Sequence, residues 1–273
     1  MHANIGRDSY FCPPFTSGMK SIISFLLKNV PRKYLQLFSH VFLRVMAIFY
    51  RGKGVECPVC GSHFRKFLPY GRKSRENALC PNCLALERHR LMWLFLQKRT
   101  DFFKDELKVL HIAPELCFID RFEQLPNIHY TTADLESPLA KVKMDIHKMP
   151  FDDGSFDVIF CNHVMEHVED DYVAMSEVKR VLKSGGWAIM QIPIFHPIPD
   201  VTIEDPSITD PKERERLFGQ DDHVRLYGKD YPDRLRKAGF EVELQDLLGE
   251  LGEDVFKLHA LPKDDPIYLC TKA

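Results

Sequence analysis

The chain has 273 residues, a length that suits one full α/β domain with a small appendage. Hydrophobic residues make up 45% of it, enough to bury a proper core, so a disordered chain without a core is excluded. The formal net charge of −2 hides an asymmetry, because residues 19–99 hold 16 Lys and Arg against three Glu, whereas residues 100–273 hold 20 against 35 acidic residues. The basic part predicts an anionic partner, lipid headgroups or RNA, unless the two parts simply attract each other across an internal interface.

The first 54 residues are predicted to form a basic, amphipathic helical segment, with Met19 as an alternative start. The helix-like stretch 34–50 is apolar, but it is short for a bilayer span and has Arg44 inside it. No small-residue cleavage site follows the apolar run before it, so a secretory signal is not expected. We expect residues 19–54 either to contact an anionic membrane surface peripherally or to pack on the body of the protein or on a second subunit.

Two C-x-x-C pairs follow in a second segment, residues 55–100, which ends in a predicted helix at 85–97. The spacing of the pairs is that of tetrahedral structural zinc sites, in which four thiolates leave no open coordination position. A redox dithiol or two disulfides are the alternatives. The predicted zinc ligands are Cys57, Cys60, Cys80 and Cys83.

From residue 101 to 273, strand and helix patterns alternate, which predicts an α/β fold with a mostly parallel sheet and helices on both faces. The predicted strands are 107–113, 128–133, 142–145, 157–161, 187–192, 240–245 and 266–271. A helix is expected at 169–182, before a glycine turn. The stretch 193–228 is rich in proline and acids and is expected to be a long irregular connection, typical of a lid over a site.

Polar residues recur where successive strands end, and ligands of open α/β sheets bind beyond those ends. Asp134 ends the second strand, where a carboxylate can accept both ribose hydroxyls of a nucleoside cofactor. Asp145 and Ile146 follow the third strand, where they can meet the adenine amine and ring. Asn162 and His163 follow the fourth strand. Each acid alone could be a helix cap or a turn former, so the recurrence is the signal.

Two longer motifs make the pattern more specific. Residues 145–168 include Phe-Asp-Asp-Gly-Ser-Phe-Asp-Val-Ile, and residues 181–190 include Leu-Lys-Ser-Gly-Gly. Together they resemble class I S-adenosylmethionine-dependent methyltransferases of the type-11 domain group, over roughly residues 107–273. The chain also resembles a bacterial subfamily with a C-P-x-C-G knuckle, a His-Ile-Ala-Pro-Glu loop and the segment 219–227. The resemblance implies a Rossmann-like fold with a seven-stranded sheet.

The first loop departs from that family, which usually has an acid and then three alternating glycines. His111 stands at the acid position, and Ala113, Glu115 and Cys117 stand at the glycine positions. We expect the loop to lose positive-φ freedom, which would weaken the site. Glu115 is predicted to contact the amino group of the cofactor instead, with His111 and Ala113 beside it.

For a hydroxyl or amine acceptor, methyl transfer needs positioning and a base. The candidate bases are His163 after the fourth strand, His196 after the fifth strand and His223 in the predicted lid. Arg225 could hold an acidic group of the substrate, with Tyr227 beside it.

The sequence therefore predicts a cytoplasmic S-adenosylmethionine-dependent methyltransferase with a structural zinc ion, acting on a small or lipid-linked metabolite. One alternative is an RNA methyltransferase that binds phosphates through the basic knuckle. A second alternative is a non-catalytic scaffold with a degenerate cofactor loop.

Overall fold

The computed structural model describes residues 45, 47–71 and 74–273. These residues form two compact units, each described by itself. The sheet unit comprises Thr100–Leu247 and Asp265–Ala273. The cysteine unit comprises the described residues up to Arg99, together with Leu248–Asp264.

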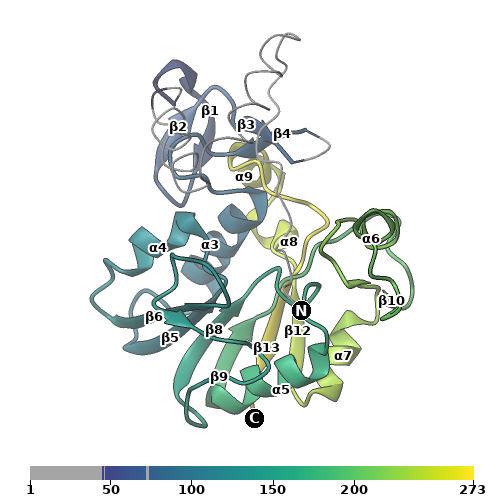
Figure 1. The fold of residues 1–273 in the computed structure, drawn as a ribbon. Coiled ribbons are helices and arrows are strands. Elements are labelled where there is room, and N and C mark those ends of the chain that lie inside the picture. Colours follow the sequence, from purple (N-terminus) through teal and green to yellow (C-terminus); the bar gives the residue numbers. More distant parts are fainter. Residues whose placement is uncertain (1–44, 46, 72–73) are drawn as a thin grey trace. The chain divides into compact units, whose positions relative to one another are not determined.

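Seven strands build the sheet unit: β5 (Leu107–Ile112), β6 (Ile128–Asp134), β7 (Val142–Lys143), β8 (Phe156–Cys161), β9 (Leu182–Ile189), β12 (Glu241–Gln245) and β13 (Ile267–Thr271). They form one sheet in the order β12-β13-β9-β8-β5-β6-β7 (Figure 1). Neighbours from β7 to β9 pair in parallel, and β13 runs antiparallel to both β9 and β12. The predicted seven-stranded, mostly parallel sheet is confirmed.

Helices cover both faces of this sheet because successive strand residues point to opposite sides. The helices of the unit are α4 (Leu116–Phe122), α5 (Asp171–Val181), α6 (Pro211–Phe218) and α7 (Tyr231–Lys237). On one face, Leu110 of β5 and Ile159 of β8 share a buried cluster with Met175 of α5. On the other face, the ring of Phe160 stacks on that of Phe122 in α4, with centroids 5.7 Å apart. The predicted helix at 169–182 is α5.

The stretch 193–228 is more ordered than the sequence predicts. It contains α6 and a pair of short strands, β10 (Ile203–Glu204) and β11 (Arg225–Leu226), which pair antiparallel. Asp210 caps α6 by accepting hydrogen bonds from the backbone N–H groups of Lys212 and Glu213, and Gly219 ends the helix at φ +91°. The connection is thus a folded subdomain and not an irregular loop.

In the described residues, the cysteine unit contains two short antiparallel strand pairs and the three helices named below. The strands are β1 (Arg51–Cys57) with β2 (Ser62–Phe64), and β3 (Leu68–Tyr70) with β4 (Arg75–Leu79). The helices are α3 (Glu87–Arg99), α8 (Leu248–Leu251) and α9 (Glu253–Leu258). The predicted helix at 85–97 is α3.

One buried arginine holds this unit together. Arg90 of α3 is 0% exposed, and its guanidinium lies 4.2 Å from the ring centroid of Phe67. It donates hydrogen bonds to five backbone carbonyl groups, those of Asn77, Ala78, Ala85, His259 and Ala260. His259 in turn contacts the backbone carbonyl of Glu56 through Nδ1 at 2.9 Å. These bonds join the segment after α9 to the knuckle strands.

The predicted division into 1–54, 55–100 and 101–273 is therefore corrected at two places. Leu248–Asp264 belongs to the cysteine unit and interrupts the sheet unit, and the boundary at 54 falls inside β1. The sheet unit of the structure begins at Thr100. Of the predicted N-terminal helix, residues 45 and 47–50 are helical, and the remainder lies outside the described residues. Within the described part of the chain, no helix has the length and apolar character needed to cross a membrane.

Candidate functional site

The carboxyl ends of β5, β6 and β8 bring several of the predicted site residues together. His111 is the last residue but one of β5 and is fully buried. Its Nδ1 lies 2.7 Å from the hydroxyl of Tyr130, and its Nε2 makes a short contact with the carboxylate of Glu115. The other Glu115 oxygen accepts a hydrogen bond from Asn162 Nδ2 at 3.2 Å. Burial raises the pKa of Tyr130, so this phenol stays protonated. A continuous series of polar side-chain contacts therefore runs from Tyr130 of β6 through His111 and Glu115 to Asn162 after β8.

The backbone of this loop keeps the left-handed conformation that the sequence argument expected it to lose. Ala113 sits at φ +50°, and its N–H donates to the carbonyl of Ala133 at 2.9 Å. The left-handed conformation costs an alanine about 1 kcal/mol, a modest strain that the surrounding hydrogen bonds can offset. The expectation of lost positive-φ freedom is therefore wrong at this position.

The two acids beyond β6 and β7 hold their own turns. Asp134 Oδ1 accepts the N–H groups of Glu136 and Ser137 at 2.8 and 2.7 Å, and among the described residues no hydrogen bond reaches its Oδ2. Asp145 Oδ1 accepts from the backbone N–H and from Nδ1 of His147, and the first of these bonds is the main reason that the pKa of Asp145 is lowered. Ile146 beside it is buried. Both carboxylates are therefore turn formers at the sheet edge.

A cluster of histidines and carboxylates follows Asn162 directly. In the loop after β8, Oε1 of Glu166 lies 3.5 Å from His163 Nδ1 and 3.9 Å from His167 Nε2. His223 joins them from the segment after α6, and its ring centroid lies 4.8 Å from that of His167. A backbone hydrogen bond from Val224 N to Glu166 O holds the two segments together.

Glu166 and Asp222 were not among the predicted site residues. The signal available for Glu166 was the run of three titratable residues within five positions, His163-Val-Met-Glu166-His167, at the end of a buried strand. Asp222 precedes His223, and its Oδ2 lies 3.5 Å from His167 Nδ1. Only the fold shows that the two segments meet.

Burial and charge set the protonation of this cluster. Burial by itself would raise the pKa of Glu166, but contacts with His163, His167 and His223 outweigh it and lower that pKa to about 2. Burial lowers the pKa of His223, against the smaller opposing effect of Glu166. At neutral pH, Glu166 is therefore a carboxylate and His223 is a neutral imidazole.

The other predicted residues of the 193–228 stretch are differently placed. His196 is exposed. Arg225 is 4% exposed and donates to the carbonyls of Met165, Val168 and Glu169 and to the carboxylate of Glu204. Tyr227 is 4% exposed and donates its hydroxyl to Asp171 at 2.8 Å. These bonds give Arg225 and Tyr227 a structural role in fastening the stretch to the loop after β8, and they do not favour the predicted contact with substrate.

The four predicted zinc ligands meet in the cysteine unit. Their sulfur atoms all lie within 4.8 Å of one another, with Cys57 and Cys83 at 3.6 Å and Cys60 and Cys80 at 3.8 Å. Four sulfurs about 2.3 Å from one zinc ion would lie about 3.8 Å apart, whereas a disulfide needs about 2.05 Å. The spacing fits tetrahedral zinc and excludes the two-disulfide alternative in this structure.

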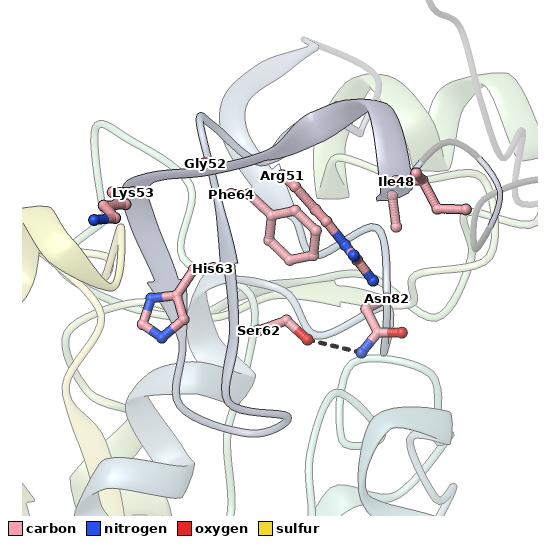
Figure 2. Close-up of a pocket in the computed structure, with 9 residues that line it drawn as sticks. Ile48, Arg51, Gly52, Lys53, Ser62, His63, Phe64 and Asn82 are labelled. Atoms are coloured by element: carbon pink, nitrogen blue, oxygen red, sulfur yellow. Dashed lines mark hydrogen bonds between the residues drawn. The ribbon is translucent and has the colours of Figure 1, made fainter.

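A groove of about 770 Å³ lies beside the knuckle in the cysteine unit. Figure 2 shows Arg51 and Lys53 on β1 with His63 and Phe64 on β2, and a hydrogen bond from Asn82 Nδ2 to Ser62 Oγ at 2.9 Å. The groove thus has basic side chains and one aromatic ring, and no acidic residue lines it among those described.

Comparisons with known proteins bear on the sheet unit. Residues 119–190 match the family described as methyltransferase domain. A 37.1 kDa uncharacterised protein in transposon TN4556 of Streptomyces fradiae is 36% identical over 72 residues, which cover 26% of this chain. An uncharacterised methyltransferase of Schizosaccharomyces pombe is 43% identical over 42 residues, or 15% of this chain. The matched parts are only 20% and 15% of the length of these two relatives.

Among solved structures, an S-adenosylmethionine-dependent methyltransferase from Archaeoglobus fulgidus is 14% identical, with a TM-score of 0.42. The alignment covers 67% of this chain and 93% of that one. We assign the fold from the strand order and the strand directions, and not from this likeness. In the sheet, β13 lies between β9 and β12 and runs antiparallel to both, whereas the other neighbouring strands are parallel. The sheet unit therefore has a Rossmann-like fold, and residues 119–190 within it match the methyltransferase domain family.

Proposed function

We propose that the protein transfers a methyl group from S-adenosylmethionine to a small or lipid-linked metabolite. The observation that carries the proposal is the row of acidic side chains at successive strand ends, Glu115, Asp134 and Asp145, in a sheet of the methyltransferase type. Ligands of such sheets bind beyond these strand ends.

The residues of this edge fit the cofactor. Its methionine part carries a positive ammonium group, which suits the Glu115 carboxylate, and Asp134 Oδ2 is the acceptor that a ribose hydroxyl would use. Asp145 and Ile146 would receive the adenine amine and ring. His111 and Asn162 contact Glu115 and orient its carboxylate, and Ala113 takes the left-handed backbone conformation in the same loop.

The bound cofactor supplies an electrophilic methyl group, and the protein supplies position and a base. Of the candidate bases, His163 lies next to Asn162 with Glu166 at 3.5 Å, and His196 is exposed. Either could take a proton from a hydroxyl or amine acceptor. His223 is 0% exposed and contacts the Phe218 carbonyl through Nδ1, so direct contact with an acceptor is not favoured.

In the cysteine unit we propose a structural zinc ion on Cys57, Cys60, Cys80 and Cys83. The sulfur spacing supports a closed tetrahedral site without an open position, so the ion would stabilise the unit and take no part in methyl transfer.

The groove beside the knuckle favours a second candidate, methylation of RNA. Arg51 and Lys53 could bind phosphates, and Phe64 could contact a base. RNA affinity that falls steeply with salt, and falls further in Arg51→Ala, would favour this candidate.

Peripheral contact with an anionic membrane is supported by the exposed side chains of Ile48 and Phe49, which are 59% and 66% exposed. Binding to anionic but not to neutral vesicles would test this contact.

The deciding experiment is calorimetric titration of S-adenosylmethionine and S-adenosylhomocysteine into zinc-replete protein. We expect micromolar binding in the wild type, a loss of roughly tenfold or more in Glu115→Gln, and no change in the control Glu123→Gln outside this row. No detectable binding by a folded, zinc-replete protein would overturn the enzyme proposal and favour the non-catalytic scaffold. Unchanged affinity in Glu115→Gln would remove only the role of that residue.

A further inference from the structure

We propose that Glu166, His167 and His223 form a binding site for one divalent transition-metal ion in the sheet unit. One ligand atom from each of the three residues lies within 4.8 Å of the other two. The site is separate from the four cysteines and does not depend on the proposed methyl transfer.

The hydrogen bonds of the two histidines direct their free nitrogens to a common point. His223 Nδ1 lies 3.0 Å from the carbonyl of Phe218, which fixes the proton on Nδ1 and leaves a lone pair on Nε2. His167 Nδ1 faces Asp222, at 3.4 Å from its carbonyl and 3.5 Å from its carboxylate, and His167 Nε2 lies toward Glu166. A carbonyl or carboxylate behind the second ring nitrogen is the usual arrangement of metal-ligating histidines.

Within the three proposed ligands, two buried acceptor atoms lack a donor. Glu166 is 1% exposed and His223 is 0% exposed, and no residue in the described part of the chain gives a hydrogen bond to Glu166 Oε2 or to His223 Nε2. A carboxylate oxygen and an imidazole lone pair cannot bond to each other, and leaving both buried without a partner costs free energy. A cation between them would satisfy both.

The alternative is an ion pair between Glu166 and protonated histidines. His163 is placed for such a pair, with Nδ1 at 3.5 Å from Oε1 of Glu166. That contact uses only one of the two carboxylate oxygens of Glu166, and it leaves His223 Nε2 without a hydrogen-bond partner. A metal ion accounts for Oε2 of Glu166 and Nε2 of His223 together.

The donor set indicates the class of metal. Two imidazoles and one carboxylate suit zinc, iron(II), cobalt(II) or manganese(II) better than calcium or magnesium, which prefer oxygen ligands. Ligand atoms at about 2.1 Å from one ion lie about 3.4 Å apart, so each separation between two of these ligand atoms would shorten by at most about 1.4 Å. His167 is 37% exposed, so the fourth position would open to solvent, where a water molecule or an oxygen of a substrate could bind.

The test is cobalt(II) titration of the full chain that carries only one equivalent of zinc, bound at the four cysteines. We expect one further cobalt ion to bind, with weak visible bands and without the intense thiolate charge-transfer band that binding at the cysteines would give. The melting temperature should rise with cobalt. Inductively coupled plasma analysis of the zinc-saturated protein should give two zinc ions per chain.

Three variants decide the assignment. Glu166→Gln keeps the shape of the buried side chain and removes its charge, His167→Gln alters a partly exposed ligand that folding tolerates, and His129→Gln changes an exposed histidine on β6 as the control. Cobalt affinity should fall roughly tenfold or more in the first two and stay unchanged in the third. If the wild type binds no metal beyond the cysteine-bound ion, or if folded His167→Gln binds cobalt as the wild type does, the proposal is wrong.

Discussion

Replacing Arg90 by leucine tests what holds the cysteine unit together. The guanidinium makes five hydrogen bonds to backbone carbonyls and is fully buried, so the substitution leaves those carbonyls in an apolar pocket. The carbonyl of Ala85 also accepts from Cys80 N and keeps one partner. A buried acceptor without a partner costs about 1–3 kcal/mol, and removing the buried charge recovers part of that cost. We expect a net loss of about 3–5 kcal/mol, a large fraction of the stability of a small domain.

The assay uses the position of the two tryptophans. Trp93 lies in α3 of the cysteine unit and Trp187 lies in β9 of the sheet unit, so in a Trp187→Phe background the fluorescence reports only the cysteine unit during urea unfolding. Arg99→Leu on the same helix is the matched control; its exposed ion pair with Glu250 should contribute less than about 1 kcal/mol. A loss below about 1 kcal/mol in Arg90→Leu would refute the reasoning.

Three further predictions concern the loop, the acid stability and the metal. Ala113→Gly should leave the free energy of unfolding unchanged or raise it by up to about 1 kcal/mol, because glycine relieves the left-handed strain but loses more conformational entropy on folding. Ala113→Val should lower the free energy of unfolding by about 1–2 kcal/mol. A valine variant as stable as the wild type in denaturant would contradict this reasoning. Burial alone would raise the pKa of Asp171, but bonds from Arg234 and the charge of Arg225 lower it, so its stabilising contribution is complete above about pH 4 and is lost as the pH falls further. The stability difference between wild type and Asp171→Asn should therefore be large at pH 7 and small near pH 2, and an equal difference at both would count against the ion pair. Removal of zinc by a strong chelator should change Trp93 fluorescence and leave Trp187 unaffected; an unchanged Trp93 signal would argue against a structural ion.

Much of the candidate site could be predicted because it depends on local order in the chain. Strands such as Phe156–Cys161 are short buried runs, and the residue after each run must lie at the sheet edge. Asp134, Asp145 and Asn162 were predicted in this way, and the two C-x-x-C turns were predicted from spacing alone. The left-handed backbone conformation of Ala113 was not predicted, because residue type predicts a conformational preference and not the hydrogen bonds that override it.

The sequence by itself determined the α/β alternation, the seven strands and the four cysteines, since each follows from periodicity or spacing within a few tens of residues. Only the tertiary structure decided that Leu248–Asp264 joins the cysteine unit through Arg90, and that His223 meets Glu166 and His167. These pairs are separated by tens to more than a hundred positions. Contacts of that kind leave no periodic trace, because they depend on how whole elements pack against one another.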